Sequence, residues 1–553
     1  MMRFARLFFI LFMVCSLNVI SICSCGASPV LFYSDITSGP NYGGQNNKGV
    51  FVTVWGKNFG SERNESVVTV GGNNVDNYPV WSDSMVCFQL GSNAKTGDII
   101  LTTPLGSSNP IPFTVRSGSI YFITPEGSGT GDYEDPCSPY DFVEHLRSGE
   151  KGVTGYFIGG EYTEQYAIKN WHANFCLSDD YSGAPGLENA FIAYPGEVVR
   201  IETSSTSGAD RNNFRLHTNP AKYIVVAKLK CYSLKGSIHA HTGWRIINNN
   251  INAIHELSGS GAISTGGYQD PTPHHIYIYG NEISGGTSGN KLDHAIYPGS
   301  GVNYLYVGWN YIHDNNFGAG PMISLNCNDS FEHKLVSQHV YFHSNIIDVS
   351  TFPSRAMGVF ETGLGSEVTY YNNLIICSED TSNYSTFYAM SANVKYYNNT
   401  LYSSGGTNLA ASFSFYSSVV YGHQYAPESI EIKNNIVYSN SKADYYIRVS
   451  GIAPMPIVQS NLFFNIQSPR DDDKYLLDEG RIISDPLFVD IQKNDFRLKN
   501  GSPAKYKAQV INLVTMDLDG VQRHIPPSLG AYEIQNSFIS SPAEFKCEDH
   551  TQQ

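Results

Sequence analysis

The chain has 553 residues, of which only 15% are charged, and its formal net charge is -15 at pH 7. This length exceeds that of an ordinary single domain, so we expect two or more structural units. The acidic balance disfavours nucleic acid as a partner and gives no general attraction to polyanions. The low charge content, together with 51 glycines and 37 tyrosines, argues against a helical bundle and favours a β-rich protein.

Residues 1–27 have the plan of a secretory signal. Arg3 and Arg6 precede the apolar run LFFILFMV, and the small-residue stretch SCGAS follows it. The apolar run is too short to span a membrane, so we expect a signal peptide cleaved near Ala27 and a secreted or cell-surface protein with no membrane span. A lipoprotein anchor at Cys25 is the less favoured alternative.

Residues 28–117 carry short alternating strands. GVFVTVWGKNFG places Val50, Val52 and Val54 at alternate positions, and SVVTVGG, MVCFQL and GDIILTTPLG follow at short intervals, each ended by turn residues. This spacing predicts a small β-sandwich. The stretch from ITSGPNYGG to WGKNFG, then Trp81-Ser82 and NPIPFTV, resembles the immunoglobulin-like IPT/TIG family. The resemblance implies a fold but no single function, since such modules serve as spacers or as binding units.

Residues 118–170 predict a capped first coil. In SPYDFVEHLRSG, Ser138 suits an N-cap, Pro139 the first helical turn and Asp141 a capping box, so a short helix is expected. The strand SIYFITPEG precedes it and GYFIGGEYTEQ follows. This order resembles the N-terminal cap of secreted right-handed parallel β-helix proteins of the pectate-lyase-like kind. The helix would plug the open end of the stack, which otherwise exposes unpaired backbone groups.

An asparagine recurs at intervals of about 30 residues, within the range of solenoid repeats. Each copy follows an alternating run and stands two residues before an apolar residue. The eight copies are Asn249, Asn281, Asn310, Asn345, Asn373, Asn399, Asn435 and Asn461. Asparagine tolerates a left-handed bend between two strands, and its amide can bond the same position one coil away. We therefore predict a column of amides along the axis of a β-solenoid, with coils about 4.8 Å apart.

The segments DPLFVDIQKNDFRLKNGSPA, DLDGVQR and SLGAYE, within residues 484–535, resemble the closing segment of many secreted β-helix proteins. SPAKYKAQ departs from the small acidic turn that is usual there, which argues against ion binding at that end. Residues 536–553 are a tail. We predict an all-β chain with an immunoglobulin-like β-sandwich over 28–117 and a right-handed parallel β-helix over 118–535.

The strands that precede each asparagine place chemistry-bearing side chains together. Counting from the asparagines puts Ile238, Ile263, Ile296, Ile323 and Val359 at inward positions. The positions beside them collect His239, His241, Asp293, His294, Tyr297, Asn326, Asn328 and Glu361, and Lys291 and Arg355 lie at the adjoining edges. A long flat face with several outward side chains per coil suits an extended polysaccharide.

This set of residues suits β-elimination of a uronic-acid polymer. The reaction removes the proton next to a sugar carboxylate, which requires a base and a cation that stabilises the developing charge. Lys291, His294 or Tyr297 would be the base. Arg355, or a Ca²⁺ ion held by Asp293 and Glu361, would be the cation. His239, His241, Asn326 and Asn328 would bind the sugar chain.

The alternative for several of these residues is a purely structural role. Asp293 and His294 would form a hydrogen-bonded surface pair, Tyr297 would pack against the next coil, and His313-Asp314 would form a turn. The sequence has no C-x-x-C pair beyond the signal, which disfavours a zinc site.

Two other functions remain open beside a polysaccharide lyase. A glycoside hydrolase or a uronate epimerase would use the same scaffold, although a hydrolase needs carboxylates at catalytic separation and only Asp293 and Glu361 are candidates. A non-catalytic glycan-binding surface protein would use aromatic coils such as SFSFYSSVVYGHQY to stack on sugar rings. Convergence of the predicted site residues on one face would favour an enzyme. The oligomeric state is not determined by the sequence.

Overall fold

The computed structural model describes residues 27–534 apart from a set of internal segments. These are 167–172, 204–211, 235, 254–260, 266–271, 287–291, 300, 317–321, 326–335, 350–359, 363–365, 378–385, 391, 405–412, 417, 421–422, 426–428, 445–446, 451–455 and 468–478. Nearly all of the predicted signal peptide and the tail from 536 lie outside the described residues. Within the described residues, no helix is both long enough and apolar enough to cross a membrane.

The first unit is the predicted β-sandwich. One sheet has the order β1-β3-β7-β6 and the other the order β2-β10-β8-β4-β5, with β9 beside β8. The strands are β1 (Val30–Ser34), β2 (Ser38–Gly39), β3 (Phe51–Lys57), β4 (Val67–Val70), β5 (Asn73–Asn74), β6 (Asn77–Trp81), β7 (Met85–Gln89), β8 (Gly97–Thr103), β9 (Gly106–Ser107) and β10 (Ile111–Val115), and a 3-10 turn covers Gln45–Asn47. Val52 and Val54 are fully buried in its core. Phe51, on the other side of β3, is also buried.

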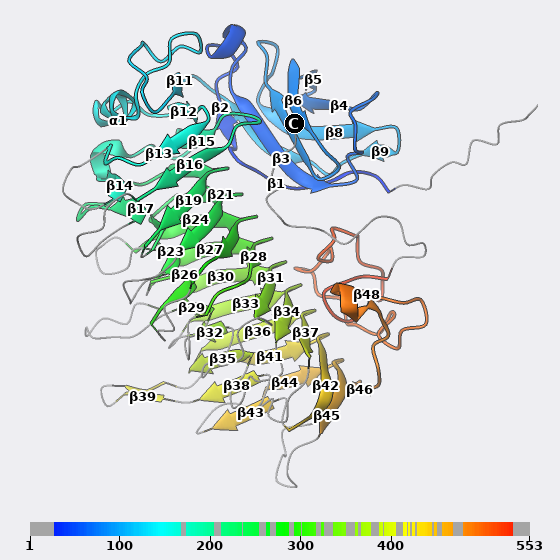
Figure 1. Ribbon diagram of the computed structural model, residues 1–553. Helices are drawn as coiled ribbons and strands as arrows, with labels where there is room; N and C mark the ends of the chain where they lie inside the picture. The colour runs from blue at the N-terminus through cyan, green and yellow to red at the C-terminus, as the bar shows by residue number, and fades with distance from the viewer. Residues whose placement is uncertain are drawn as a thin grey trace, which may run out of the picture.

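Three parallel sheets form the second unit, and the chain visits them in turn in each coil from β12 to β43 (Figure 1). Sheet 1 contains β11 (Ile120–Ile123), β12 (Thr154–Phe157), β15 (Asn189–Ala193), β18 (Ile224–Ala227), β21 (Arg245–Ile247), β24 (His274–Tyr279), β27 (Asn303–Gly308), β30 (Gln338–His343), β33 (Glu367–Tyr371), β36 (Asn393–Tyr397), β41 (Ile430–Lys433) and β44 (Ile457–Gln459). Each strand pairs with its counterpart one coil away, as Tyr277 pairs with Tyr306. The predicted parallel β-helix is confirmed.

The other two sheets complete the coils. Sheet 2 contains β13 (Gly160–Tyr162), β16 (Val199–Glu202), β19 (Lys230–Ser233), β22 (Asn250–Ala253), β25 (Glu282–Ser284), β28 (Tyr311–Ile312), β31 (Ile346–Val349), β34 (Leu374–Cys377), β37 (Thr400–Ser403), β42 (Ile436–Asp444), β45 (Leu462–Gln467) and β46 (Ile482–Ile483). Sheet 3 contains β14 (Ala173–Leu177), β17 (Asn212–Leu216), β20 (Ile238–Ala240), β23 (Gly261–Thr265), β26 (His294–Tyr297), β29 (Ile323–Leu325), β32 (Phe360–Thr362), β35 (Phe387–Met390), β38 (Phe413–Tyr416) and β43 (Ile447–Ser450). A hairpin of β39 (Ser418–Val420) and β40 (His423–Tyr425) and a 3-10 turn at Asp179–Tyr181 lie between strands.

Helix α1 (Pro139–Arg147) plugs the first coil as predicted. The Ser138 hydroxyl accepts a hydrogen bond from the Asp141 N–H at 3.1 Å, which satisfies a backbone donor at the helix start. Phe142, Val143 and Leu146 are buried in the same core as the first strands of the coil. The ring of Phe142 lies against Gly155, where an added Cβ atom would meet it at 2.4 Å.

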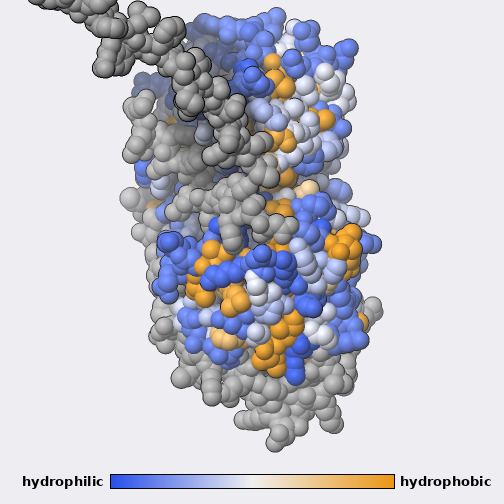
Figure 2. Space-filling view, turned by 90° about the vertical axis from the view of Figure 1, so that its right-hand side faces the viewer, coloured by the Kyte–Doolittle hydropathy of each residue, from blue (hydrophilic) through white to orange (hydrophobic). Residues whose placement is uncertain are grey.

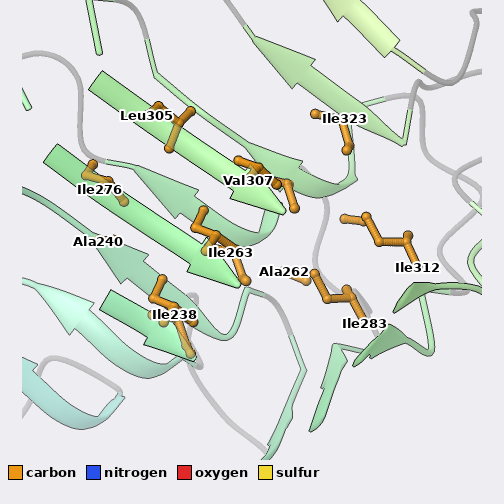
Figure 3. Packing of buried hydrophobic residues seen from close by; sticks show 14 of the residues in the cluster. Ile238, Ala240, Ala262, Ile263, Ile276, Ile283, Leu305, Val307, Ile312 and Ile323 are labelled. Carbon is orange, nitrogen blue, oxygen red and sulfur yellow. The ribbon is translucent and has the colours of Figure 1, made fainter. Parts of the chain in front are cut away.

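The interior of the stack is a set of apolar rows. Ile238, Ile263, Ile296 and Ile323 pair from coil to coil and point inward, as Figure 3 shows for three of them. The fifth predicted member is wrong: Ile323 pairs with Phe360, not Val359. The segment before β32 is long, so counting from the asparagines missed the register by one residue.

The asparagine column is confirmed. Asn310 donates from its backbone N–H and from Nδ2 to Asn345 Oδ1, at 3.1 and 2.9 Å. The same pair of bonds joins every successive member from Asn249 to Asn461, and all eight side chains are fully buried. These bonds hold the corner between sheet 1 and sheet 2.

The left-handed bend at this corner falls one residue earlier than predicted. The preceding residues have positive φ angles, and they are Asn248, Gly280, Trp309, Ser344, Asn372, Asn398, Asn434 and Ser460. The bend and the amide column are therefore carried by neighbouring residues.

The β-sandwich lies directly on the outer face of sheet 1. The Tyr156 hydroxyl, from β12, donates to Phe51 O at 2.9 Å and accepts from Phe51 N at 2.8 Å. Further along, the Arg245 guanidinium donates to Ser34 O at 2.8 Å and to Asp35 O at 3.2 Å. These contacts join the two units as one packed body, so the sandwich is not a free spacer.

The closing segment does not add another coil. After β46 it forms the hairpin of β47 (Phe488–Asp490) and β48 (Asp495–Leu498), with a 3-10 turn at Ile491–Lys493, and runs back along the outer face of sheet 2 (Figure 1). Asn372 Nδ2 donates to Met516 O at 2.7 Å. Lys57 of the sandwich forms a salt bridge with Asp519, so the two flanking units touch. Figure 2, which faces this side, shows separate hydrophobic patches among polar surface.

Four described cysteines, Cys87, Cys137, Cys176 and Cys231, are buried free thiols. Burial raises the pKa of the Cys87 thiol to about 11, so it stays protonated at neutral pH. These residues act as core side chains.

Candidate functional site

Sheet 3 carries an outward row with one residue per coil. Strand alternation places this row between the buried rows on either side of it. Register places in it Arg215, His239, Ser264, Tyr297, Ser324 and Glu361, which we call the sheet 3 row. Neighbouring members stand about one coil spacing, or 4.8 Å, apart. Ser264 and Ser324 are buried, so a linear polymer along the axis would meet the larger side chains on either side of them.

Three predicted site residues, His239, Tyr297 and Glu361, fall in this row. His239 and Tyr297 are half-buried. The position of Glu361 rests on the strand pairing between Ser324 and Glu361, since its side chain lies outside the described part of the structure. The row thus collects an imidazole, a phenol and a carboxylate position from three coils.

His294 lies beside the row and Asp293 behind it. The His294 and Tyr297 rings stack at 4.9 Å with an interplanar angle of 9°. His294 is 5% exposed and Asp293 is fully buried, so neither is a surface residue. The imidazole is therefore placed to support the Tyr297 ring, and the surface location expected for Asp293 and His294 is wrong, since both are buried.

His241 is a buried residue at the end of β20. It is 3% exposed, and its Nδ1 makes no hydrogen bond within the described residues. Burial, with help from the charges of Lys222 and His274, lowers the pKa of His241 to about 4. Its imidazole is neutral and buried, so the structure does not place His241 where a sugar chain could bind. Lys291, Arg355, Asn326 and Asn328 lie outside the described residues.

The proposed calcium pair does not fit one ion. Asp293 precedes Tyr297 by four residues, and Glu361 lies two coils beyond Tyr297. With a rise of about 3.3 Å per residue and about 4.8 Å per coil, their backbones lie roughly 16 Å apart. Ca²⁺ ligands must approach to about 2.4 Å, so these two carboxylates cannot share a cation. Within the described part of the chain, no group of three His, Cys, Asp or Glu residues could hold a metal.

Sequence reasoning missed Arg215. It lies in the repeating pattern NNFRL of β17, where Phe214 is buried and Arg215 is half-buried. The asparagine column begins only at Asn249, so counting from it did not reach β17. The alternation of NNFRL was the signal that could have found this cation.

A second group that sequence reasoning set aside lies on the outer face of sheet 2. His313 stands between two carboxylates, with Nε2 at 3.0 Å from Glu282 Oε1 and Nδ1 at 2.8 Å from Asp314 Oδ2. Its ring stacks on Tyr311 at 4.2 Å. The segment is a turn, as expected, but the turn also builds a carboxylate–imidazole–carboxylate group across two coils.

This group predicts a pH-dependent stability. Burial alone would lower the pKa of His313, but hydrogen bonds to Glu282 and Asp314 outweigh burial and raise it. A raised pKa in the folded state stabilises the protein below the unfolded value of about 6.5, and the stabilisation is lost as the pH rises through the folded value. Glu282→Gln should therefore cost about 0.5–1 kcal/mol at pH 5.5 and much less at pH 9. Urea unfolding at both pH values measures this, and an equal loss at the two would contradict it.

Comparison with known proteins bears mainly on the first unit. The family model for the IPT/TIG domain matches residues 34–115. These residues form an IPT/TIG domain. The matched segment runs from the end of β1 to the end of β10, so the TIG domain is the unit that lies on sheet 1. No curated protein matches the chain.

Several solved structures are similar in outline to the chain. Pectate lyase Pel9A has 13% identity and a TM-score of 0.47, covering 76% of this chain and 97% of its own. A rhamnogalacturonan lyase has 12% identity and a TM-score of 0.35, covering 71% and 96%. A PL6 family alginate lyase, AlyGC, has 11% identity and a TM-score of 0.36, covering 72% and 58%. At these values the similarity gives no argument about the reaction of this chain.

Proposed function

We propose that this chain is a secreted polysaccharide lyase that cleaves an acidic polysaccharide by β-elimination along the sheet 3 row. The observation that supports the proposal is the alignment of Arg215, His239, Tyr297 and Glu361 in one outward row. The row offers positions for a cation, an imidazole, a phenol and a carboxylate, one coil apart for Arg215 and His239 and two coils apart for each later pair. An extended uronate chain along the axis would meet a cation and a base on the same face.

The elimination needs a defined set of proton and electron movements. A base takes the proton from the sugar carbon next to the carboxylate, the electron pair forms a carbon–carbon double bond, and the bond to the leaving glycosidic oxygen breaks. That oxygen then receives a proton. We assign the base to Tyr297, whose ring is held by His294, with Lys291 and His294 as the alternatives. Arg355 would stabilise the negative charge that develops on the uronate at Tyr297. Arg215 lies three coils from Tyr297, roughly 14 Å away, so it would bind a carboxylate further along the chain.

Tyr297→Phe should reduce the rate of cleavage by about 100-fold or more, because general base catalysis contributes at least this factor. The assay is a panel of the uronate polymers polygalacturonate and alginate, with xylan as a polymer whose xylose units have no carboxylate, followed by the ultraviolet absorbance of the unsaturated product, with and without a chelator. Tyr42→Phe, which changes an exposed tyrosine of the TIG domain, is the matched control and should leave the rate unchanged.

The same panel separates the competing functions. Released reducing ends without absorbance would indicate a hydrolase. Retention on a polysaccharide column with neither signal would indicate a glycan-binding protein. A Tyr297→Phe variant as fast as the unaltered chain would remove Tyr297 from the mechanism.

A further inference from the structure

A double row of aromatic side chains lies on the outer face of sheet 1, away from the sheet 3 row. It occupies three consecutive coils, at strands β24, β27 and β30. One stack contains His275, Tyr304 and His339, and the other contains Tyr277, Tyr306 and Tyr341; we call the six residues the ring strip. The ring centroids within the stacks are 4.6 to 5.3 Å apart, and the interplanar angles are 6° to 20°.

The rings of the strip are held in place by stacking on one another and by a contact with the coil below. The Arg245 guanidinium lies 5.2 Å from the Tyr277 ring centroid and is fixed by its bonds to the TIG domain. Within each stack, neighbouring rings cover the faces between them. His275 and Tyr304 are exposed, and Tyr306 is half-buried.

The hydroxyl groups of the strip are available to a ligand. Within the described part of the chain, the hydroxyls of Tyr277, Tyr304, Tyr306 and Tyr341 make no hydrogen bond. Two buried tyrosines elsewhere use this group: the Tyr156 hydroxyl donates to Phe51 O and the Tyr162 hydroxyl to Ile158 O. Burial raises the pKa of Tyr306 and of Tyr341, so these phenols stay protonated and can both donate and accept.

The backbone of the strip is in an unfavourable conformation for its residues. His275, Tyr304 and His339 have φ angles of 55°, 52° and 54°. The left-handed region suits glycine and asparagine, and a bulky residue there costs of order 1–3 kcal/mol. The coil below has Gly243 at the equivalent position, with φ of 74°. Three successive aromatic residues at such a position indicate a use for the rings beyond coil packing, since asparagine or glycine would build the same bend at less cost.

We propose that the ring strip is a second polysaccharide-binding site, separate from the cleavage row, which holds the polymer parallel to the solenoid axis. This inference rests on the proposed function for the class of ligand. The strip presents one phenol per coil at about 5.2 Å, a comb of donors and acceptors that repeats with the coil. It contains no Lys, Arg, Asp or Glu, so its chemistry matches the hydroxyl groups of a sugar chain and not the carboxylates.

The test is the affinity of the full chain for polygalacturonate, alginate and xylan, measured by affinity electrophoresis. The triple variant Y277F/Y306F/Y341F removes only three hydroxyl groups and keeps the stacked rings. Each lost hydrogen bond is worth about 0.5–1 kcal/mol, so for three bonds we expect the Kd for the bound polysaccharide to rise roughly 10-fold to 100-fold. Tyr42→Phe is the control and should bind as the unaltered chain does. An unchanged melting temperature shows that the triple variant is folded.

The outcomes separate this inference from the proposed function. If the unaltered chain cleaves a polymer and the triple variant binds it equally well, the strip is not a binding site while the proposed function stands. If the unaltered chain binds a polymer without cleaving it and the triple variant loses the binding, the strip stands while the lyase proposal fails. If the unaltered chain binds none of the three, both are overturned.

Discussion

Replacing Asn345 by alanine should lower the free energy of unfolding by about 3–5 kcal/mol, because three buried polar groups lose their partners. Asn345 Oδ1 accepts from both the N–H and the Nδ2 of Asn310, and its own Nδ2 donates to Val307 O at 3.0 Å. Asn345 and Asn310 are fully buried, so water cannot replace the lost amide. Each buried group left without a partner costs about 1–3 kcal/mol.

The measurement is urea unfolding of the full chain beside a matched control. Asn219→Ala changes an exposed asparagine whose side chain makes no hydrogen bond in the described structure, and it should alter stability by less than about 0.5 kcal/mol. Equal stabilities for the two variants would mean that the amide column does not hold the coils together.

The sequence was sufficient to predict the coils because the asparagine column has a local signature. A buried amide at a corner needs an alternating strand before it and an apolar residue two positions after it, and all three lie within a few residues. This signature does not show which residue at the corner adopts the left-handed conformation and which one provides the buried amide. Asn372-Asn373, Asn398-Asn399 and Asn434-Asn435 are adjacent pairs, and only the structure shows that the first member bends and the second bonds.

The repeating sequence pattern could not predict contacts between distant segments. The closing segment has no repeat, so nothing in it indicated that Met516 would receive a hydrogen bond from Asn372, which is 144 residues earlier. The sequence indicates only that Tyr156 is a strand residue, yet its hydroxyl donates a hydrogen bond to Phe51 O of the TIG domain. These contacts depend on which faces of two separately predicted units meet, and that choice is made by many side chains together.

The candidate site was predictable in part for the same reason. His239 and Tyr297 follow inward isoleucines directly, so strand alternation places them outward. His241 shares the parity of His239, but β20 ends at Ala240 and His241 begins the turn that the Trp244 N–H closes by donating to His241 O, and its imidazole is buried. The contact of His313 with Glu282 joins two coils, and no local pattern gives the length of the loop between them.

Lys228→Met should destabilise the protein by about 3–5 kcal/mol, because it leaves a buried carboxylate without its counter-charge. Lys228 lies at the corner beneath the TIG domain, with Nζ at 3.1 Å from Asp35 Oδ2 and 2.8 Å from Thr53 Oγ1. Asp35 is fully buried; its Oδ1 accepts from the N–H groups of Ile36 and Thr53, but its Oδ2 makes no hydrogen bond within the described residues. The ammonium group is therefore the charge that balances Oδ2.

The double variant Lys228→Met/Asp35→Asn tests this cause. Removing the buried charge as well should recover part of the loss, so the two changes should be non-additive by at least about 1 kcal/mol. Lys493→Met is the matched control: Lys493 pairs with Asp490 at 3.1 Å, but its side chain is 82% exposed, so its loss should cost less than about 1 kcal/mol. Unfolding is followed by denaturant titration, with proteolysis between the two units as a second readout. If the double variant loses as much unfolding free energy as the two single variants together, the charge of this pair does not stabilise the contact between the TIG domain and sheet 1.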